Sequence, residues 1–202
     1  MMLKDKLISE IIDIEIKMFL SVPALQKSGC QKYPNKFRMH RRAQFFSWSE
    51  DTLESYLGDL KSAAKKNENL MAQKYARMGN LIPPINKNPL IKKIVKILYK
   101  WQKEMISKYP NLMRRARPLS RYEDSTDVTS FETYLTGELE TYSDKTIGLL
   151  YRDICDKIRL KINMAEEVYT VFAREQGYGS IREAEETIGK RRETNTDTMK
   201  IS

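Results

Sequence analysis

The chain has 202 residues, of which 41% are hydrophobic and 31% are charged, a balance typical of a globular protein with a sizeable core. Lys and Arg exceed Asp and Glu by 36 to 27, and no apolar run approaches the roughly 18 residues of a membrane-spanning helix. With only two cysteines and one histidine, a disulfide scaffold and a cysteine zinc site are excluded, and little room is left for histidine chemistry.

The first 19 residues do not form the pattern of a signal peptide. Acidic side chains at Asp5, Glu10, Asp13 and Glu15 interrupt the apolar residues there, whereas an export signal needs a continuous apolar core. We therefore expect a cytoplasmic protein with reduced thiols, and we expect no metal ion or other cofactor.

The composition favours an all-α fold. Gly and Pro are scarce, at eight and seven residues, and helix-forming Leu, Ile, Met, Lys and Glu are plentiful. We expect a single-domain helical bundle of about seven or eight helices over residues 1–190, followed by a polar, flexible tail over residues 191–202. The expected helices cover residues 3–20, 36–48, 49–79, 90–108, 129–142, 144–176 and 181–190.

Local signals mark several of the expected helix ends. Ser49 is a good N-cap because acidic residues follow it, and Gly79 is a plausible stop. The stretch between them is either one helix or two that meet near Asn67. Thr129 begins a capping-box pattern, and residues 109–129, with two prolines and the acidic run EDSTD, predict a long loop. Loops of this length in a compact domain often carry function.

Polar side chains fall on the apolar faces of the expected helices. At about 100° per residue, Glu15 lies near the centre of the first apolar face, and Arg41 and Gln44 lie between aromatic residues of the second. Lys74 and Glu138 take similar positions further along the chain. Because buried charge is costly unless it is paired and hydrogen-bonded, we expect these groups to meet.

A cluster of this kind shifts pKa values and can carry acid–base chemistry. We therefore predict a metal-free enzyme that acts on a small anionic or zwitterionic substrate, with lyase, transferase and hydrolase reactions all left open. A structural ion-pair network is the alternative for the same residues. The expected catalytic residues are Glu15, Asp59, Lys74, Glu138 and Tyr142, and the expected substrate-binding residues are Arg41, Gln44, Trp48, Tyr75, Tyr134, Arg117 and Arg121.

The segment 87–121 predicts a second kind of site. It carries eleven basic side chains and one acidic side chain, and the helix within it is sharply amphipathic. This surface could make the protein a non-enzymatic binding module for RNA, DNA or an acidic protein partner. A solvated helix with its apolar side in the core is the simpler interpretation, and we identify neither an exposed aromatic residue nor a known nucleic-acid-binding module. The lysines concerned are Lys92, Lys93, Lys96, Lys100 and Lys103.

Six segments together resemble an uncharacterised bacterial family, domain of unknown function 4125. They are CQKYPNKF, RAQFFSWS, YLGDL, NLMAQKYARM, TSFETYL and GELETYS, in this order between Glu15 and Tyr151. The resemblance implies a bacterial protein but no particular reaction, and some relatives joined to a nucleotidyltransferase-like domain imply a possible partner of that kind. His40 and Gly79 stand where that family has methionine, which argues against a catalytic His40. The resemblance carries over onto Glu15, Cys30, Gln31, Phe37, Arg41, Gln44, Trp48, Tyr56, Asp59, Asn69, Lys74, Tyr75, Glu138, Tyr142 and Ser143.

Overall fold

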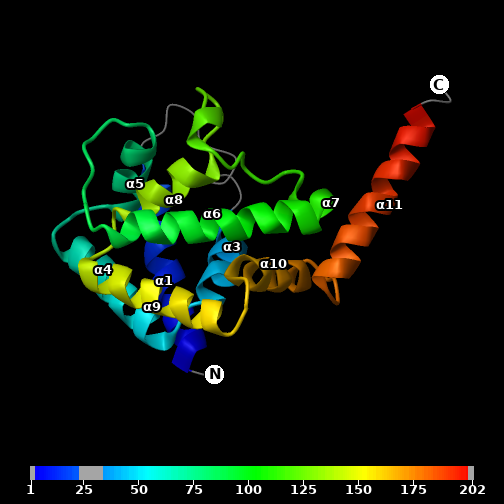
Figure 1. Ribbon diagram of the computed structural model, residues 1–202. Coiled ribbons are helices and arrows are strands. Elements are labelled where there is room, and N and C mark those ends of the chain that lie inside the picture. Colours follow the sequence, from blue (N-terminus) through cyan, green and yellow to red (C-terminus); the bar gives the residue numbers. More distant parts are fainter. Residues whose placement is uncertain (1–2, 23–33, 200–202) are drawn as a thin grey trace.

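The protein is all-helical, as its composition predicts (Figure 1). The structure, a computed structural model, describes residues 3–22 and 34–199, which contain ten α-helices and one 3₁₀ turn. The helices are α1 (Leu3–Leu20), α3 (Pro34–Phe46), α4 (Glu50–Lys65), α5 (Leu70–Met78), α6 (Leu90–Lys108), α7 (Pro110–Met113), α8 (Phe131–Leu139), α9 (Asp144–Arg159), α10 (Met164–Glu175) and α11 (Ile181–Met199), and the 3₁₀ turn is η1 (Arg121–Glu123).

The helix count exceeds the expected seven or eight because long helical patterns break and because the short helix α7 forms within the predicted loop 109–129. The break between α4 and α5 falls at Asn67, which has a positive φ of 56°, so the two-helix alternative for residues 49–79 is confirmed. The expected single helix over residues 144–176 is wrong. Lys161, also at φ 56°, ends the first half, and the side chain of Asn163 accepts hydrogen bonds from the backbone at the start of α10. Asparagine adopts positive φ more readily than other non-glycine residues, whereas lysine rarely does, so only the break at Lys161 has no sequence signal at the residue itself.

One large apolar core, with buried residues from Leu7 to Met164, holds most of the fold together. α1 packs against α3, α4 and α5, α4 packs on α9, and α5 packs on α8. α6 crosses the front of the molecule in Figure 1 and contacts α8, α9 and α10. Fully buried side chains from α1, α3, α4, α6, α8 and α9 meet in this core, among them Phe19, Phe45, Leu53, Leu60, Ile94, Leu139 and Ile147.

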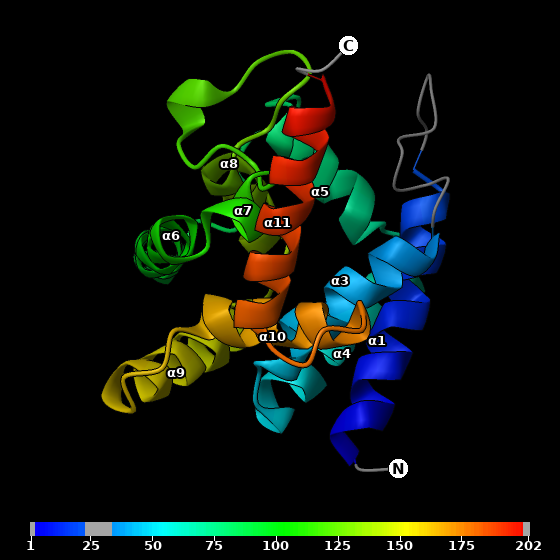
Figure 2. The ribbon, with the colours of Figure 1, turned by 90° about the vertical axis from the view of Figure 1, so that its right-hand side faces the viewer.

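A smaller apolar cluster joins the last helices. Met105, Tyr109 and Met113 pack there with Ile181 at the start of α11, and the Glu185 carboxylate accepts backbone N–H groups at the start of α7. α11 then points away from the body of the molecule and reaches Met199 (Figures 1 and 2). The backbone is thus helical through most of the segment 191–202 that we expected to be a tail.

No helix in the ranges 3–22 and 34–199 is both long and apolar enough to cross a membrane.

Candidate functional site

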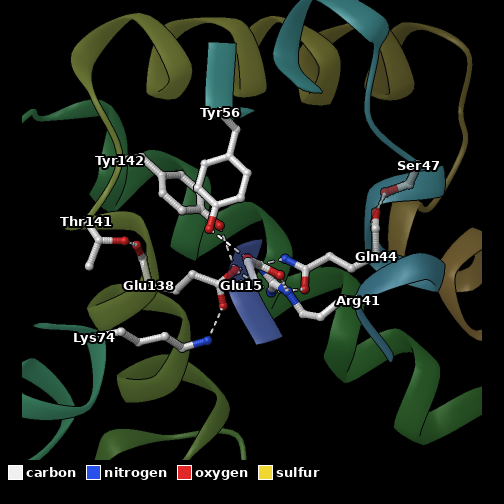
Figure 3. Close-up of polar contacts among 9 residues, drawn as sticks. All are labelled: Glu15, Arg41, Gln44, Ser47, Tyr56, Lys74, Glu138, Thr141 and Tyr142. Carbon is white, nitrogen blue, oxygen red and sulfur yellow. Dashed lines mark hydrogen bonds and ion pairs between the residues drawn. The ribbon is translucent and has the colours of Figure 1, made fainter. Parts of the chain in front are cut away.

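Seven polar side chains from different parts of the chain meet in the middle of the fold (Figure 3). They come from α1, α3, α4, α5 and α8 and from the residues just after α8. Their charged members are 0–3% exposed, so the site is enclosed by protein. We call these seven residues the charged cluster: Glu15, Arg41, Gln44, Tyr56, Lys74, Glu138 and Tyr142.

Arg41 and Glu15 form the first half of the charged cluster. The Arg41 Nε donates to Glu15 Oε2 at 2.7 Å, and its Nη2 donates to Glu15 Oε1. Tyr56 adds a hydroxyl that donates to the same Oε1 at 2.7 Å. Both carboxylate oxygens of Glu15 therefore accept hydrogen bonds. The two-pronged contact with Arg41 fixes the orientation of the guanidinium and also pairs its charge.

Glu138 is the centre of the second half. Its Oε1 accepts from Arg41 Nη1 at 2.7 Å, from the Tyr142 hydroxyl at 2.6 Å and from Gln44 Nε2 at 3.2 Å. Its Oε2 accepts from the Lys74 ammonium at 2.6 Å. Gln44 also accepts from Arg41 through its own side-chain oxygen at 2.7 Å, which links the two halves.

The charges in the cluster balance, with two carboxylates against two cations. Burial alone would raise the pKa of Glu138, but Arg41 and Lys74 outweigh it and hold that pKa well below its usual range. Burial would likewise lower the pKa of Lys74, but the neighbouring Glu138 raises it. As the site stands, Glu138 is a carboxylate and Lys74 an ammonium at neutral pH.

The two tyrosines stay protonated. Burial and the adjacent Glu15 carboxylate raise the pKa of Tyr56 well above its usual value. Burial and Glu138 do the same for the pKa of Tyr142. Both hydroxyls therefore serve as hydrogen-bond donors to carboxylates rather than as bases.

Aromatic rings wall the cluster on one side. Trp48 is 3% exposed, and its ring meets those of Tyr56 and Tyr142 edge-on at centroid distances of 5.8 and 5.9 Å. The Arg41 guanidinium lies 4.5 Å from the ring centroid of Phe45. Trp48, an expected substrate-binding residue, thus contacts two tyrosines of the cluster through its ring and contributes an apolar surface.

On the opposite flank, a row of three side chains leads from the cluster towards solvent. The Lys74 ammonium lies 3.8 Å from the ring centroid of Tyr134, and the guanidinium of exposed Arg117 lies 4.6 Å from the same centroid. Arg117 also donates to the backbone oxygen of Thr129 at 3.0 Å. Tyr75, in turn, is half-buried and packs with Phe19 at the edge of the core.

Two of the predicted site residues lie apart from the cluster. The Asp59 carboxylate accepts from the Ser143 backbone N–H at 3.0 Å and from the Thr146 hydroxyl at 2.7 Å, so it braces the start of α9. Arg121 is exposed and pairs with Glu132 at 2.9 Å. The structure therefore places Asp59, one of the expected catalytic residues, against the start of α9 rather than beside Arg41 and Lys74, because it lies at the edge of its helix face.

A second polar array between α4 and α9 was not predicted. The buried Asp153 carboxylate accepts from the Thr52 hydroxyl at 2.6 Å and from the Ser49 backbone N–H at 2.9 Å. Ser55 and Thr146 share a hydrogen bond of 2.8 Å. Small hydroxyl residues give little contrast in a helical pattern, so the sequence carries no strong signal for this array.

Tyr56 is the one cluster residue that helical periodicity did not single out as functional. Its ring is 1% exposed and packs in the core as an ordinary aromatic residue would, and only the resemblance pointed to it. Cys30 and Gln31, which the resemblance also includes, lie outside the described residues.

The predicted N-cap of α8 moves by one residue. Ser130, which is fully buried, accepts the Thr133 backbone N–H through its hydroxyl, and Thr129 precedes it.

No group of three or more His, Cys, Asp and Glu side chains is gathered at metal-binding distances in the parts of the chain that the structure describes.

Comparison with known proteins gives one match. A family model described as "Protein of unknown function (DUF4125)" covers residues 5–186. No curated protein and no solved structure matches the chain.

Proposed function

The chain belongs to the DUF4125 family of proteins of unknown function, and we propose that its charged cluster is a metal-free site for acid–base chemistry on a small anionic or zwitterionic molecule. One observation carries this proposal. The residues through which the sequence resembles that family include all seven members of the cluster, although the chain brings them from positions as far apart as 15 and 142.

Stability alone is a weak reason for such a cluster. Replacing a buried ion pair with apolar residues of similar volume is often neutral or stabilising. Here four charged side chains, each at most 3% exposed, are assembled from four helices. A function that needs preorganised charge in a dry site explains that assembly better than packing does.

An anionic group of the substrate would take over contacts that Glu138 now makes. The Lys74 ammonium and the Arg41 Nη1 both point at Glu138, and a carboxylate or phosphate group fits such cations equally well. Once these cations bind the substrate, burial becomes the dominant influence on the pKa of Glu138 and raises it. Glu138 would then be a general base with a pKa closer to neutral.

The rest of the cluster would hold and orient the substrate. Glu15 keeps Arg41 in place through its two-pronged contact. The Tyr142 hydroxyl, freed from Glu138, is a proton donor within the site, and Gln44 can both donate and accept. Entry would pass Tyr134, whose ring lies beside the Lys74 ammonium, and Arg117, whose guanidinium packs on the same ring. Lyase, transferase and hydrolase reactions can each use such a proton transfer.

Ligand-dependent stability tests the proposal. Urea unfolding of the protein is measured alone and with inorganic phosphate, acetate, succinate, glycine or taurine. A ligand at 100 times its Kd adds about 2.7 kcal/mol to the free energy of unfolding. We expect at least one of these compounds to stabilise the protein.

Two single-residue variants show whether a stabilising ligand binds at the charged cluster. Lys74→Met should abolish the stabilisation, whereas Lys66→Met, at an exposed position after α4, should keep it. A response that is the same in both variants, or no response to any of the five compounds, would overturn the proposal and leave the cluster as a structural ion-pair network.

A further inference from the structure

The outer side of α6 is a strip of uncompensated positive charge. Five of the six lysines of α6 are exposed and pair with no acidic side chain within residues 3–22 and 34–199, whereas the sixth, Lys108, pairs with Glu166. From the first to the last the five span about 16 Å at 1.5 Å per residue. These residues, which we call the lysine strip, are Lys92, Lys93, Lys96, Lys100 and Lys103.

The apolar side of α6 packs on the core, where Leu90, Ile97 and Leu98 are partly buried. Ile91, Ile94, Trp101 and Met105 are at most 8% exposed. An amphipathic helix that inserts into a membrane surface offers its apolar face to the lipid, whereas this face of α6 packs on the core. The lysine strip is therefore suited to a polyanion in solution rather than to a lipid surface.

The hydrogen-bonded turn η1 carries an exposed aromatic side chain. Tyr122 in η1 is 94% exposed, although we had identified no exposed aromatic residue from the sequence. The loop that contains η1 lies above α6 in Figure 1, and both segments lie at the left of the molecule in Figure 2. Exposed Arg114 and Arg115 lie in the segment that connects α7 to this loop.

Hydrogen bonds hold the turn in a fixed shape. Ser120 and Glu123 form a reciprocal capping box around Tyr122. The Asp124 carboxylate accepts from the backbone N–H of Ser130 at 2.6 Å and from the hydroxyl of Thr133. Arg121 is tied to α8 through Glu132. An ordered turn with an unburied tyrosine at its tip loses little conformational entropy when a flat partner stacks on it.

We infer that the lysine strip and Tyr122 together bind single-stranded nucleic acid. The lysines would neutralise backbone phosphates, and the tyrosine ring would stack on an unpaired base. A groove or strip of positive charge beside an aromatic platform is the arrangement that single strands need, because every base offers a face for stacking. A duplex hides its base faces and would meet only the lysines. This inference stands apart from the proposal for the charged cluster, which it does not use.

Fluorescence anisotropy with a labelled 12-residue oligouridine, and with a duplex of equal length, tests the inference over a range of salt concentrations. Lys96→Gln/Lys100→Gln should reduce the steepness of log K against log [salt] by about 1.4, since each phosphate contact contributes about 0.7 on a single strand. Tyr122→Ala should weaken oligouridine binding about tenfold without changing the salt dependence of binding. Tyr122→Trp should restore the affinity for oligouridine. Duplex binding should not respond to Tyr122→Ala.

The matched control is Lys65→Gln/Lys66→Gln, which removes the same charge from an exposed place at the end of α4 and should leave the slope unchanged. If both double variants reduced the slope of log K against log [salt] equally, the effect would come from overall charge, and the inference would be overturned. Unchanged oligouridine affinity in Tyr122→Ala would overturn it too, as would tighter binding to polyglutamate competitor or phosphatidylserine vesicles than to oligouridine.

Discussion

Arg41 on α3 and Glu15 on α1 form a two-pronged ion pair in which each partner is at most 3% exposed. The third nitrogen of the same guanidinium reaches Glu138 on α8 at 2.7 Å. One cation therefore ties together three helices that are far apart in the sequence. Burial alone would lower the pKa of Arg41, but Glu138 and Glu15 raise it well above its usual value.

Removing this cation should cost far more than removing a neighbouring surface charge. Arg41→Leu leaves two buried carboxylates without their main partner, and we expect a loss of about 3–5 kcal/mol in the free energy of unfolding. Arg38→Leu on the same helix breaks an exposed pair with Asp13 and should cost about 1 kcal/mol or less. Urea denaturation measures both, and similar losses in the two variants would contradict this account of Arg41.

Lys74 and Glu138 should behave as an energetically coupled pair. Lys74→Met and Glu138→Gln each unbalance the charge of a buried site, whereas the double variant restores the balance. We expect the double variant to be more stable than the sum of the single losses implies, with a coupling of about 1–3 kcal/mol. A double-mutant cycle by urea denaturation measures it. Gln73→Met paired with Glu138→Gln is the control, because Gln73 is a neighbour of Lys74 in sequence, and this pair should be additive.

Glu138 should make the protein sensitive to acid. Arg41 and Lys74 overcome the effect of burial and hold its pKa below that of the unfolded chain, so the unfolded chain binds more protons between the two pKa values. The free energy of unfolding then rises with pH in that window and falls as pH drops below about 5. Glu138→Gln should flatten this fall, measured by urea denaturation between pH 3 and pH 7. Tyr142→Phe keeps the Glu138 carboxylate, so its free energy of unfolding should fall with decreasing pH almost as steeply as that of the wild type. If the wild type and Glu138→Gln lost stability equally steeply, Glu138 would not be the group responsible.

Asp59 should act as a brace without a role in ligand binding. Asp59→Ala removes the acceptor of the Ser143 N–H and the Thr146 hydroxyl, and we expect a loss of about 1–3 kcal/mol. The stabilisation by any ligand of the charged cluster should persist in this variant at an unchanged Kd, measured by ligand-dependent unfolding. If ligand no longer stabilised Asp59→Ala, as expected for Lys74→Met, Asp59 would instead be part of the ligand-binding site.

The sequence predicted the buried cluster best where a single helix carried a regular pattern. Arg41 and Gln44 stand between Phe37 and Trp48 at steps of four, three and four, and the structure buries Arg41 and Trp48 at 3% exposed. Helical periodicity says which side of a helix faces inward. It does not say which neighbouring helix a residue at the edge of that side will meet, and Asp59 therefore turned to α9 rather than to the cations.

Other features had no periodic signal to follow. The break at Lys161 depends on a positive φ at a residue that rarely adopts it, although Asn163 two residues later is a recognisable cap. The exposure of Tyr122 follows from hydrogen bonds of the loop to α8, and these depend on tertiary contacts. Loops and helix breaks were thus harder to predict than helix faces.

Lys74 should be chemically protected in the closed protein and exposed when its cover is removed. Reductive methylation attacks neutral amines, and Lys74 is 2% exposed with a raised pKa, because Glu138 outweighs the effect of burial. Lys96 on the lysine strip should therefore be methylated long before Lys74. Arg117→Ala/Tyr134→Ala takes away the ring beside the ammonium and the guanidinium that packs on that ring. In this variant Lys74 should react severalfold faster, as measured by peptide mass spectrometry.

General loss of stability could also speed this reaction, so the comparison needs a variant that is destabilised elsewhere. Ile154→Val, in the core on α9, costs about 0.5–1.5 kcal/mol without touching the cover. Reaction that rises only in the Arg117/Tyr134 variant identifies this flank as the entry to the charged cluster. Equal acceleration in both variants would mean that Lys74 is reached by unfolding, and the proposed entry past Tyr134 would be wrong.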